Sequence, residues 1–400
     1  MQPAARSRAI RPDLRAFLSL GFRPLYLVGV AWAVVAVALW VFAPQWLRPP
    51  LDGVAWHAHE MLWGFVATIA VGFLMTAGAN WTGINPMPAG ALVPALALWL
   101  TARIGFLAGG ESAFVAAAVA EVAFFLLAAA ALGRVVATAR SRRNYAVPFM
   151  LAALAAADAA FLLAAWQGDR PQLMHRFEAG MLVMAVLALL VARRVIPFFA
   201  MRAVPGLQIP LHERTGLAQL GAGTLAIAAL LAGAAWAAAA ALAVAGGLAL
   251  VQTLAWRPWA VRRVPLLWIL YLGYAGLGLG LLLAAARFGG VELRGAVPVH
   301  VVAMAGFSVL IIGMVTRTAL GHLGRALVVD RSMIASYACV IAAAALRLFA
   351  LWPSGLSLPA LHASALAWTA GFALYLWRFV PWLIRPRADA AQQVTVARSA

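Results

Sequence analysis

Histidines stand where several long apolar stretches of the chain begin. His57 and His59 open one such stretch, and His175, His300 and His362 each open or precede another. Ionisable side chains at the edge of a hydrocarbon-length segment are costly, so they suggest functional sites. Neutral imidazole is a common ligand of haem iron and of copper. These five histidines are therefore the candidate ligands, although a lone histidine at a membrane interface more often has a structural role.

The sequence WHAHEMLWG, residues 56–64, places two histidines, a glutamate and a methionine within one short segment. Because His57 and His59 are two residues apart, a continuous helix turns their side chains roughly 200° from one another. We expect one face to carry His57, Glu60, Met61 and Gly64, and the other to carry His59, Leu62, Trp63 and Val66. The two histidines should therefore have different roles.

Two later stretches repeat part of this arrangement. His175 and Glu178 are three residues apart and His300 and Met304 are four apart, so each pair shares a helix face. Facing helices in a bundle core build metal sites from such side chains. We predict that His59 and His300 are haem-side ligands, and that the other three histidines complete a haem or copper site: His57, His175 and His362.

Charged residues near these histidines have both functional and structural interpretations. Glu60 and Glu178 could orient an imidazole N–H or relay protons toward a buried site. A carboxylate near a helix N-terminus is also favourable through the helix dipole alone. Four arginines, Arg103, Arg170, Arg176 and Arg294, could bind haem propionates or could equally anchor helices at the interface.

The elements that must position these residues are membrane helices. The chain has 400 residues, of which 65% are hydrophobic and 10% are charged, and no soluble domain has this composition. The longest apolar tract, 217–256, is too long for one helix, and we divide it at Gly233. Twelve windows can then cross about 30 Å of hydrocarbon: 24–43, 60–79, 90–108, 113–133, 146–166, 177–198, 217–233, 236–256, 265–286, 298–316, 333–352 and 360–383. The predicted fold is an all-α polytopic membrane bundle of about twelve transmembrane helices.

The basic residues, all of them arginine, are distributed as the positive-inside rule requires. With a cytoplasmic N-terminus, 23 of the 30 fall in cytoplasmic segments and 7 outside. With eleven helices, the segments after Gly233 would change sides of the membrane, and their arginines would no longer follow the positive-inside rule. Both termini are therefore predicted to be cytoplasmic. The net charge of +18 reflects this distribution, so the lipid bilayer is the expected partner and nucleic acid is not.

No extramembrane segment is long enough to form a separate domain. We expect one transmembrane domain over residues 1–386 and a disordered cytoplasmic tail over residues 387–400. The single cysteine, Cys339, excludes an intramolecular disulfide and the CxxCH attachment of c-type haem. The basic N-terminus has no small-residue cleavage site, so a removable signal peptide is not expected.

Short motifs at the predicted cytoplasmic helix ends combine glycine or proline with arginine, asparagine or histidine. They are expected to form tight turns that let helices pack and satisfy terminal carbonyls. The motifs are GFRPLYL (21–27), GANWTG (78–83), RRVIPFF (193–199) and TRTALGHLGR (316–325). Together with WHAHEMLWGF they resemble the NnrS family of bacterial membrane proteins, in the family's order, from residue 17 to about residue 385.

This resemblance implies a twelve-helix protein of the bacterial inner membrane that contains haem b and copper. It also implies a link to nitric oxide metabolism and tolerance in denitrifying and pathogenic bacteria, with nitric oxide as the small-molecule ligand. It implies no settled reaction, so an NO-related oxidoreductase activity stays open. The metal ligands do not carry over from the resemblance, and the histidine assignment rests on the predicted topology.

The chain is also similar, more loosely, to the haem–copper oxidase superfamily, which includes nitric oxide reductases. That similarity implies a twelve-helix core in three arcs of four helices, with histidine ligands on helices 2, 6, 7 and 10. Helix 7 of this chain, GLAQLGAGTLAIAALLAG, lacks the histidine pair that holds copper, and PVHVVAMAG on helix 10 has a single histidine. A divergent NO or oxygen reductase with rearranged ligands is therefore an alternative.

Two further alternatives belong to other functional classes. Twelve helices with cytoplasmic termini are a common transporter layout, and a transporter could carry a metal, haem or a small metabolite. Glu121 and Asp158 lie deep in apolar runs and could be its proton or counter-ion sites, with Arg347 as a partner for either. The third alternative is an NO sensor or assembly factor that acts through a protein partner.

Overall fold

The computed structural model describes residues 11–389, and this part of the chain is helical without any strand. Eleven helical segments are long and apolar enough to span a membrane, so the chain is a multi-pass membrane protein. They are α2 (Phe22–Phe42), α3–η2–α4 (Gly53–Thr82), α5 (Ala89–Ala108), α6 (Glu111–Thr138), α7 (Ala146–Trp166), α8 (Arg170–Ala203), α9 (Glu213–Leu231), α10 (Ala235–Ala255), α11 (Pro265–Phe288), α12–η5–α13 (Ala296–His322) and α14 (Arg331–Phe349). The twelfth long helix is α15 (Ser357–Leu383). Short turns precede or link them: α1 (Leu14–Phe17), η1 (Pro44–Trp46), η3 (Arg142–Asn144) and η4 (Pro258–Val261).

The division of the 217–256 tract at Gly233 is confirmed. Helix α9 ends at Leu231 and α10 begins at Ala235. Gly233 lies between them with a φ of 72°, a left-handed conformation that glycine adopts without steric cost. The chain therefore reverses direction at this residue.

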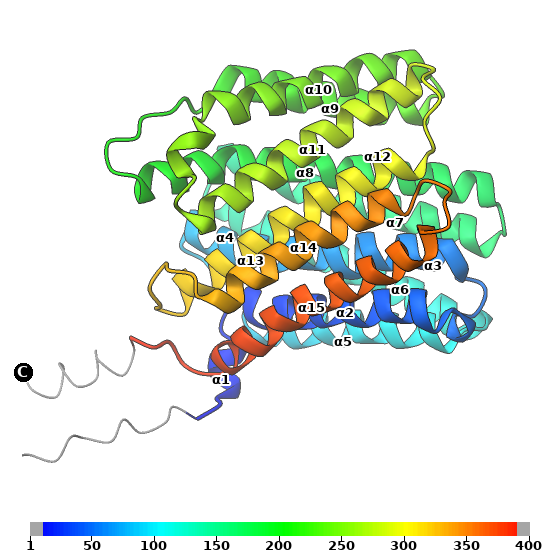
Figure 1. Cartoon of the computed structure of the whole chain (residues 1–400). Helices are drawn as coiled ribbons and strands as arrows, with labels where there is room; N and C mark the ends of the chain where they lie inside the picture. The colour runs from blue at the N-terminus through cyan, green and yellow to red at the C-terminus, as the bar shows by residue number, and fades with distance from the viewer. Residues whose placement is uncertain (1–10, 390–400) are drawn as a thin grey trace, which may run out of the picture.

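The ends of the described chain meet at one end of the bundle. The Asp13 amide donates a hydrogen bond to the Ile384 carbonyl at 2.8 Å, and Figure 1 shows α1 beside the end of α15. Helices α3 and α12 begin at the opposite end, here called the far end. An even number of crossings brings both ends of a chain to one side, so this arrangement agrees with twelve helices. Residues 390–400 of the predicted tail lie outside the described residues.

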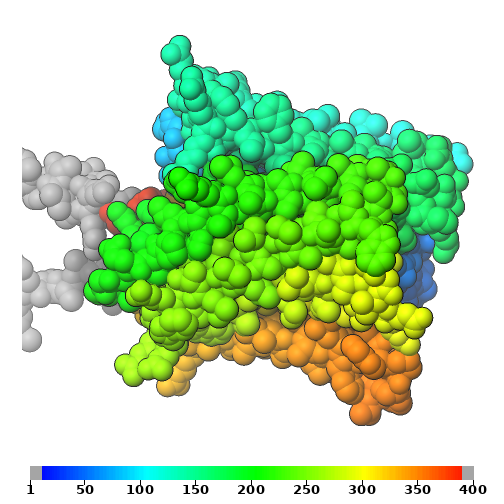
Figure 2. Space-filling model, turned by 90° about the horizontal axis from the view of Figure 1, so that it is seen from above, coloured from blue at the N-terminus to red at the C-terminus, as the bar shows by residue number. Residues whose placement is uncertain are grey.

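Helices 2, 6 and 10 of the twelve lie at the centre of the bundle. In the most apolar 18-residue stretch of each helix, 83% of the residues are buried in α3–η2–α4 and 67% are buried in α8 and in α12–η5–α13. In α14 the buried share is 33%. The remaining helices pack largely in chain order around this centre, and α15 closes the circuit against α2. Figure 2 shows the outer pair α9–α10 from above. This pair exposes Leu217, Trp236 and Leu254, which suits contact with lipid.

Two of the three central helices, α3–η2–α4 and α12–η5–α13, contain a π-helical segment. Segment η2 (Glu60–Ala67) follows His59, and η5 (Val301–Ser308) follows His300. A hydroxyl group bonds to a carbonyl five residues earlier in each: Thr68 to Trp63 at 3.0 Å and Ser308 to Ala303 at 2.8 Å. Wide turns of this kind occur often at functional sites.

The motifs at the end that holds the chain termini do form helix-end contacts. The Arg23 guanidinium donates to the carbonyls of Leu383 and Arg385 at 2.8 and 2.6 Å, which satisfies the C-terminal end of α15. Gly83 ends α4 with a φ of 72°, and the Arg317 guanidinium lies 3.6 Å from the centroid of the Phe199 ring. The predicted helix-end role is thus right for GFRPLYL and GANWTG, whereas RRVIPFF lies inside α8, which continues to Ala203, and TRTALGHLGR is helical as far as His322.

Candidate functional site

A cavity of about 380 Å³ opens among the far-end halves of the central helices. Apolar side chains form most of its wall, and two histidines, His57 and His300, face it together with several methionines. Ligand sites in proteins have this character: a concave, mainly apolar space with a few polar groups that fix orientation. We call it the far-end cavity.

His300 is oriented by its own helix. Its Nδ1 lies 2.7 Å from the Ala296 carbonyl oxygen. A carbonyl can only accept, so Nδ1 carries the proton and donates it. The tautomer leaves a lone pair on Nε2, which is the arrangement of a metal-binding histidine.

His57 has an unsatisfied ring nitrogen. Its ring stacks on Trp40 with a centroid distance of 5.0 Å and an interplanar angle of 12°, so its orientation is fixed by packing. Its Nδ1 is buried and has no hydrogen-bond partner. Buried polar atoms in folded proteins are almost always paired, and this unpaired atom belongs to a residue that lines the cavity.

Sulfur and charged groups complete the cavity wall. Met61 and Met304 each lie one turn beyond a cavity histidine, and Met181 comes from α8. Thioether and imidazole together suit copper(I) and haem iron. The charged groups in the wall are Arg347 and an ion pair between Glu178 and Arg287, whose Oε1 and Nη1 are 2.6 Å apart.

His59 belongs to a second, separate site. Its ring is fully buried; Nδ1 lies 3.0 Å from Glu60 Oε1, and Nε2 lies 3.0 Å from Asp158 Oδ1 and 3.3 Å from Glu121 Oε2. The carboxylates of Glu121 and Asp158 come from α6 and α7. Among the described residues this is the one group of three side chains, His59, Glu121 and Asp158, whose ligand atoms all lie within 4.8 Å of one another. We call it the buried cluster.

Arg103 of α5 is the cation of the buried cluster. It pairs with both Glu60 and Glu121, and the Trp32 indole donates to Glu60 Oε2 at 2.5 Å. The guanidinium occupies the space above Gly64, where an added Cβ would contact Arg103 and lie 2.7 Å from Glu60 Oε2. Glycine at this position is therefore what admits the arginine.

The predicted division of WHAHEMLWG into two faces is right for the histidines and wrong for several residues that follow. Leu62 and Val66 line the far-end cavity with His57, whereas Glu60 contacts His59 and Gly64 faces Arg103. The prediction assumed a regular helix. Because η2 has wider turns, residues after His59 shift in phase around the axis.

The five far-end histidines do not converge on a single site. The structure brings His57 and His300 together, and it places His59 in the buried cluster. His175 is half-buried outside the residues that line the cavity. His362 packs against the Phe42 ring at 5.5 Å.

The predicted charged site residues are also dispersed. Arg103 and Glu60 meet in the buried cluster, whereas Glu178 lines the far-end cavity. Arg294 donates to the Leu351 carbonyl at 2.7 Å and is exposed. Arg176 is half-buried and does not line the far-end cavity.

The partners of Glu121 and Asp158 could not be read from the sequence. The transporter alternative offered Arg347 as a partner for either carboxylate, but Arg347 lines the far-end cavity. The two carboxylates contact His59 and Arg103 instead. The signal that marked Glu121 and Asp158 was their position deep in apolar runs, where an unpaired charge is costly. That signal identified them as functional candidates without indicating which helices they face.

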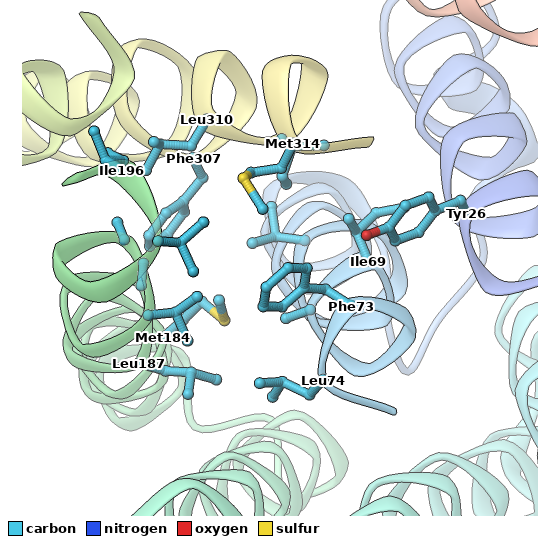
Figure 3. Close-up of a pocket in the computed structure, with 17 residues that line it drawn as sticks. Tyr26, Ile69, Phe73, Leu74, Met184, Leu187, Ile196, Phe307, Leu310 and Met314 are labelled. Carbon is cyan, nitrogen blue, oxygen red and sulfur yellow. The ribbon is translucent and has the colours of Figure 1, made fainter. Parts of the chain in front are cut away.

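A smaller apolar pocket of about 90 Å³ shares part of its lining with the far-end cavity. Val66 and Phe307 line both spaces, and Figure 3 shows Phe73, Met184 and Phe307 pointing into the pocket from three different helices. Phe73, Val191 and Val195 in turn line a third pocket, of about 840 Å³, near the chain termini. Three arginines line that third pocket: Arg143, Arg194 and Arg317.

The sequence was also compared with known proteins. No curated protein matches the chain. Residues 16–387 match the family described as NnrS protein, a span that covers nearly the whole chain and every element of both sites. The resemblance seen in the motifs is thereby confirmed, and the chain belongs to the NnrS family.

Proposed function

We propose that the far-end cavity binds haem b and that the protein acts in nitric oxide metabolism or tolerance at the bacterial inner membrane. The observation that carries the proposal is the pair formed by His57, with its unsatisfied buried nitrogen, and His300, whose tautomer leaves Nε2 free. These residues fit a haem or copper ion because their nitrogens lack competing partners. Bound haem iron would supply a site for a small apolar gas such as nitric oxide.

The chain's own residues have defined tasks in this proposal. His57 and His300 would offer imidazole nitrogens to a haem iron or a copper ion. Stacking on Trp40 and the hydrogen bond to the Ala296 carbonyl hold the two rings in place. Arg347 is the cation placed to pair with propionates. The apolar wall excludes water, which favours binding of an uncharged gas over charged solutes.

Copper is the second metal that the cavity wall suits. Met61, Met181 and Met304 present thioethers to the same space as the two imidazoles. Soft sulfur donors select copper(I) among the available metals. We therefore propose that copper is held on the methionine side of the cavity.

The small apolar pocket supports access of gas to this site through the protein interior. It shares Val66 and Phe307 with the far-end cavity and is lined by apolar side chains together with Tyr26. Nitric oxide is small and apolar and partitions into bilayers. We propose that the far end faces outward and that both termini are cytoplasmic, as the arginine distribution favours.

The proposal is tested by the optical spectrum of the protein purified from haem-replete cells. A Soret band and bound copper are expected in the wild type, and both His57→Ala and His300→Ala should lose most of the Soret absorbance. His175→Ala and His362→Ala are matched controls outside the cavity lining and should keep it. Wild-type protein with neither haem nor copper would contradict the proposal.

A transporter is the second candidate, and one observation favours it. The three pockets share lining residues in succession, from the far-end cavity to the arginine-lined pocket near the termini. Gradient-driven uptake of a solute into vesicles that survives both His57→Ala and His300→Ala would favour transport. Uptake at the level of empty vesicles would exclude it for that solute.

A further inference from the structure

We propose that the buried cluster is a second metal site, in which His59, Glu121 and Asp158 bind a divalent first-row cation such as Mn²⁺, Fe²⁺ or Zn²⁺. It is distinct from the far-end cavity in its residues and in its donor chemistry. The proposal does not depend on haem or copper binding in that cavity.

The spacing of the three donors fits a metal ion. His59 Nε2 lies 3.0 Å from Asp158 Oδ1 and 3.3 Å from Glu121 Oε2. Metal–nitrogen and metal–oxygen bonds of about 2.0–2.2 Å place neighbouring ligand atoms about 3.0–3.4 Å apart in tetrahedral or octahedral sites. The three ligand atoms lie within 4.8 Å of one another, so one cation can contact all three side chains once the side chains adjust.

Unsatisfied oxygen atoms point to a missing positive partner. Asp158 Oδ2 is buried and has no hydrogen-bond partner, and the residue is fully buried. Glu121, also buried, has ionic contacts with His59 and Arg103 but no hydrogen bond of normal geometry. A buried carboxylate is costly unless it is paired or bound to a metal.

The net charge of the buried cluster is balanced by one divalent cation. The cluster holds three carboxylates, Glu60, Glu121 and Asp158, and a single guanidinium, that of Arg103, which pairs with the first two. With a neutral imidazole the surplus is two negative charges, which one divalent cation balances. Charge balance matters here because uncompensated charge in a membrane interior is expensive.

The contacts around His59 resemble those that support histidine ligands of metals. Its Nδ1 lies 3.0 Å from Glu60 Oε1, so a proton on Nδ1 is donated to the carboxylate and Nε2 keeps its lone pair for the metal. Glu60 is in turn held by Trp32 and Arg103. Phe106, Trp63 and Phe161 enclose the imidazole at centroid distances of 4.9, 5.3 and 5.5 Å, which keeps the site dry.

The donor set distinguishes the two sites. One imidazole with two carboxylates favours Mn²⁺, Fe²⁺ or Zn²⁺, whereas the imidazole and thioether groups of the far-end cavity favour copper(I) or haem. The two sites should therefore hold different metals. Loss of one should leave the other in place.

The test is the metal content of the protein purified in detergent from cells grown with Mn²⁺, Fe²⁺ and Zn²⁺, measured by mass spectrometry. We expect about one divalent ion per chain, and visible d–d absorption after growth with Co²⁺. The near-isosteric variants Glu121→Gln and Asp158→Asn should each reduce this metal at least tenfold, and Glu60→Gln should weaken it by about 10–100-fold in affinity. Glu178→Gln, which removes a carboxylate elsewhere, is the matched control and should retain it.

The readouts separate this proposal from haem binding. His57→Ala and His300→Ala should keep the divalent ion and lose the Soret band. Asp158→Asn should lose the divalent ion and keep the Soret band. Wild-type protein without a stoichiometric divalent ion, even after growth with Co²⁺, would overturn the metal site and identify the cluster as an ion-pair network. Retention of the ion in both Glu121→Gln and Asp158→Asn would overturn it as well. If the variants do not fold, the wild-type metal content alone decides.

Discussion

His57 and His59 are two residues apart and serve different sites. His57 lines the far-end cavity with His300, and His59 Nε2 lies 3.0 Å from Asp158 Oδ1 in the buried cluster. A single helix start thus supplies one histidine to each of two proposed metal sites. Substitutions can therefore be designed to disturb one site without the other.

Gly64→Ala should destabilise the protein through the buried cluster. The added Cβ would lie 2.7 Å from Glu60 Oε2 and 2.9 Å from Trp32 Nε1 and would contact Arg103. Overpacking of this kind costs about 1–3 kcal/mol. Thermal unfolding in detergent should show a lowered Tm, while Gly90→Ala, where nothing lies within 4 Å of the new Cβ, should leave the Tm unchanged or raise it. Equal Tm values for the two variants would refute the packing argument.

Arg103→Met should be among the most damaging single substitutions. It removes the cation that pairs with Glu60 and Glu121, both buried. Breaking a buried ion pair by removing one partner costs about 3–5 kcal/mol. Adding Glu121→Gln should restore part of the stability, because it removes one of the uncompensated charges. A double variant that is less stable than Arg103→Met would show that charge is not the cause.

Met61→Leu combined with Met304→Leu should lower the copper content and leave the haem spectrum largely intact. Leucine keeps the volume of the side chain but has no sulfur, so packing costs stay below about 1.5 kcal/mol. Copper per chain is measured by mass spectrometry beside the Soret absorbance. Met150→Leu, on α7 and away from the cavity lining, is the control. An unchanged copper content in the double variant would show that these two thioethers do not bind copper.

Val66→Phe should slow the entry of gas to the far-end cavity. Val66 lines both that cavity and the small apolar pocket, so a larger side chain narrows the connection. Nitric oxide rebinding after flash photolysis should be slower than in the wild type, with the Soret position unchanged. Val93→Phe, at a residue that is 50% exposed on α5, is the size-matched control. Equal rebinding rates in both variants would argue that gas enters by another path.

Asp330 gives a pH dependence outside the membrane-spanning segments. Burial alone would raise its pKa, but hydrogen bonds from the Ser332 hydroxyl, the Met333 amide and Arg378, at 2.5, 3.1 and 2.6 Å, outweigh it and hold the pKa below its usual value. A pKa lower in the folded than in the unfolded state stabilises the fold above the unfolded value of about 3.9, and this stabilisation is lost as the pH falls through the folded pKa.

The corresponding variant is Asp330→Asn, because asparagine caps a helix about as well as aspartate. The side chain is 37% exposed, so solvent screening limits the expected loss at pH 7 to less than about 1 kcal/mol. The Tm difference from the wild type at pH 7 should be smaller at a pH below the unfolded value of about 3.9 and should shrink further as the pH falls. A difference that is the same at both pH values would contradict the ionic contribution.

The sequence determined the helices and the sites at which chemistry is concentrated. Apolar window length fixed twelve long helices, and Gly233 marked the one ambiguous boundary, because these features depend on local composition and backbone freedom. The same local geometry turned His57 and His59 to different sides. The apolar composition around Glu121 and Asp158 marked them as functional candidates, because a charge is costly in an apolar run.

Only the tertiary structure decided which residues meet. His59 and Asp158 are 99 residues apart, and their contact depends on how α3, α6 and α7 pack, which helical periodicity does not specify. The π-helical turns of η2 and η5 changed the phase of the residues after each histidine, since a period of 3.6 residues holds only for a regular α-helix. The sequence paired His59 with His300, whereas the packing of α3 against its neighbours places His57 beside His300 in the far-end cavity.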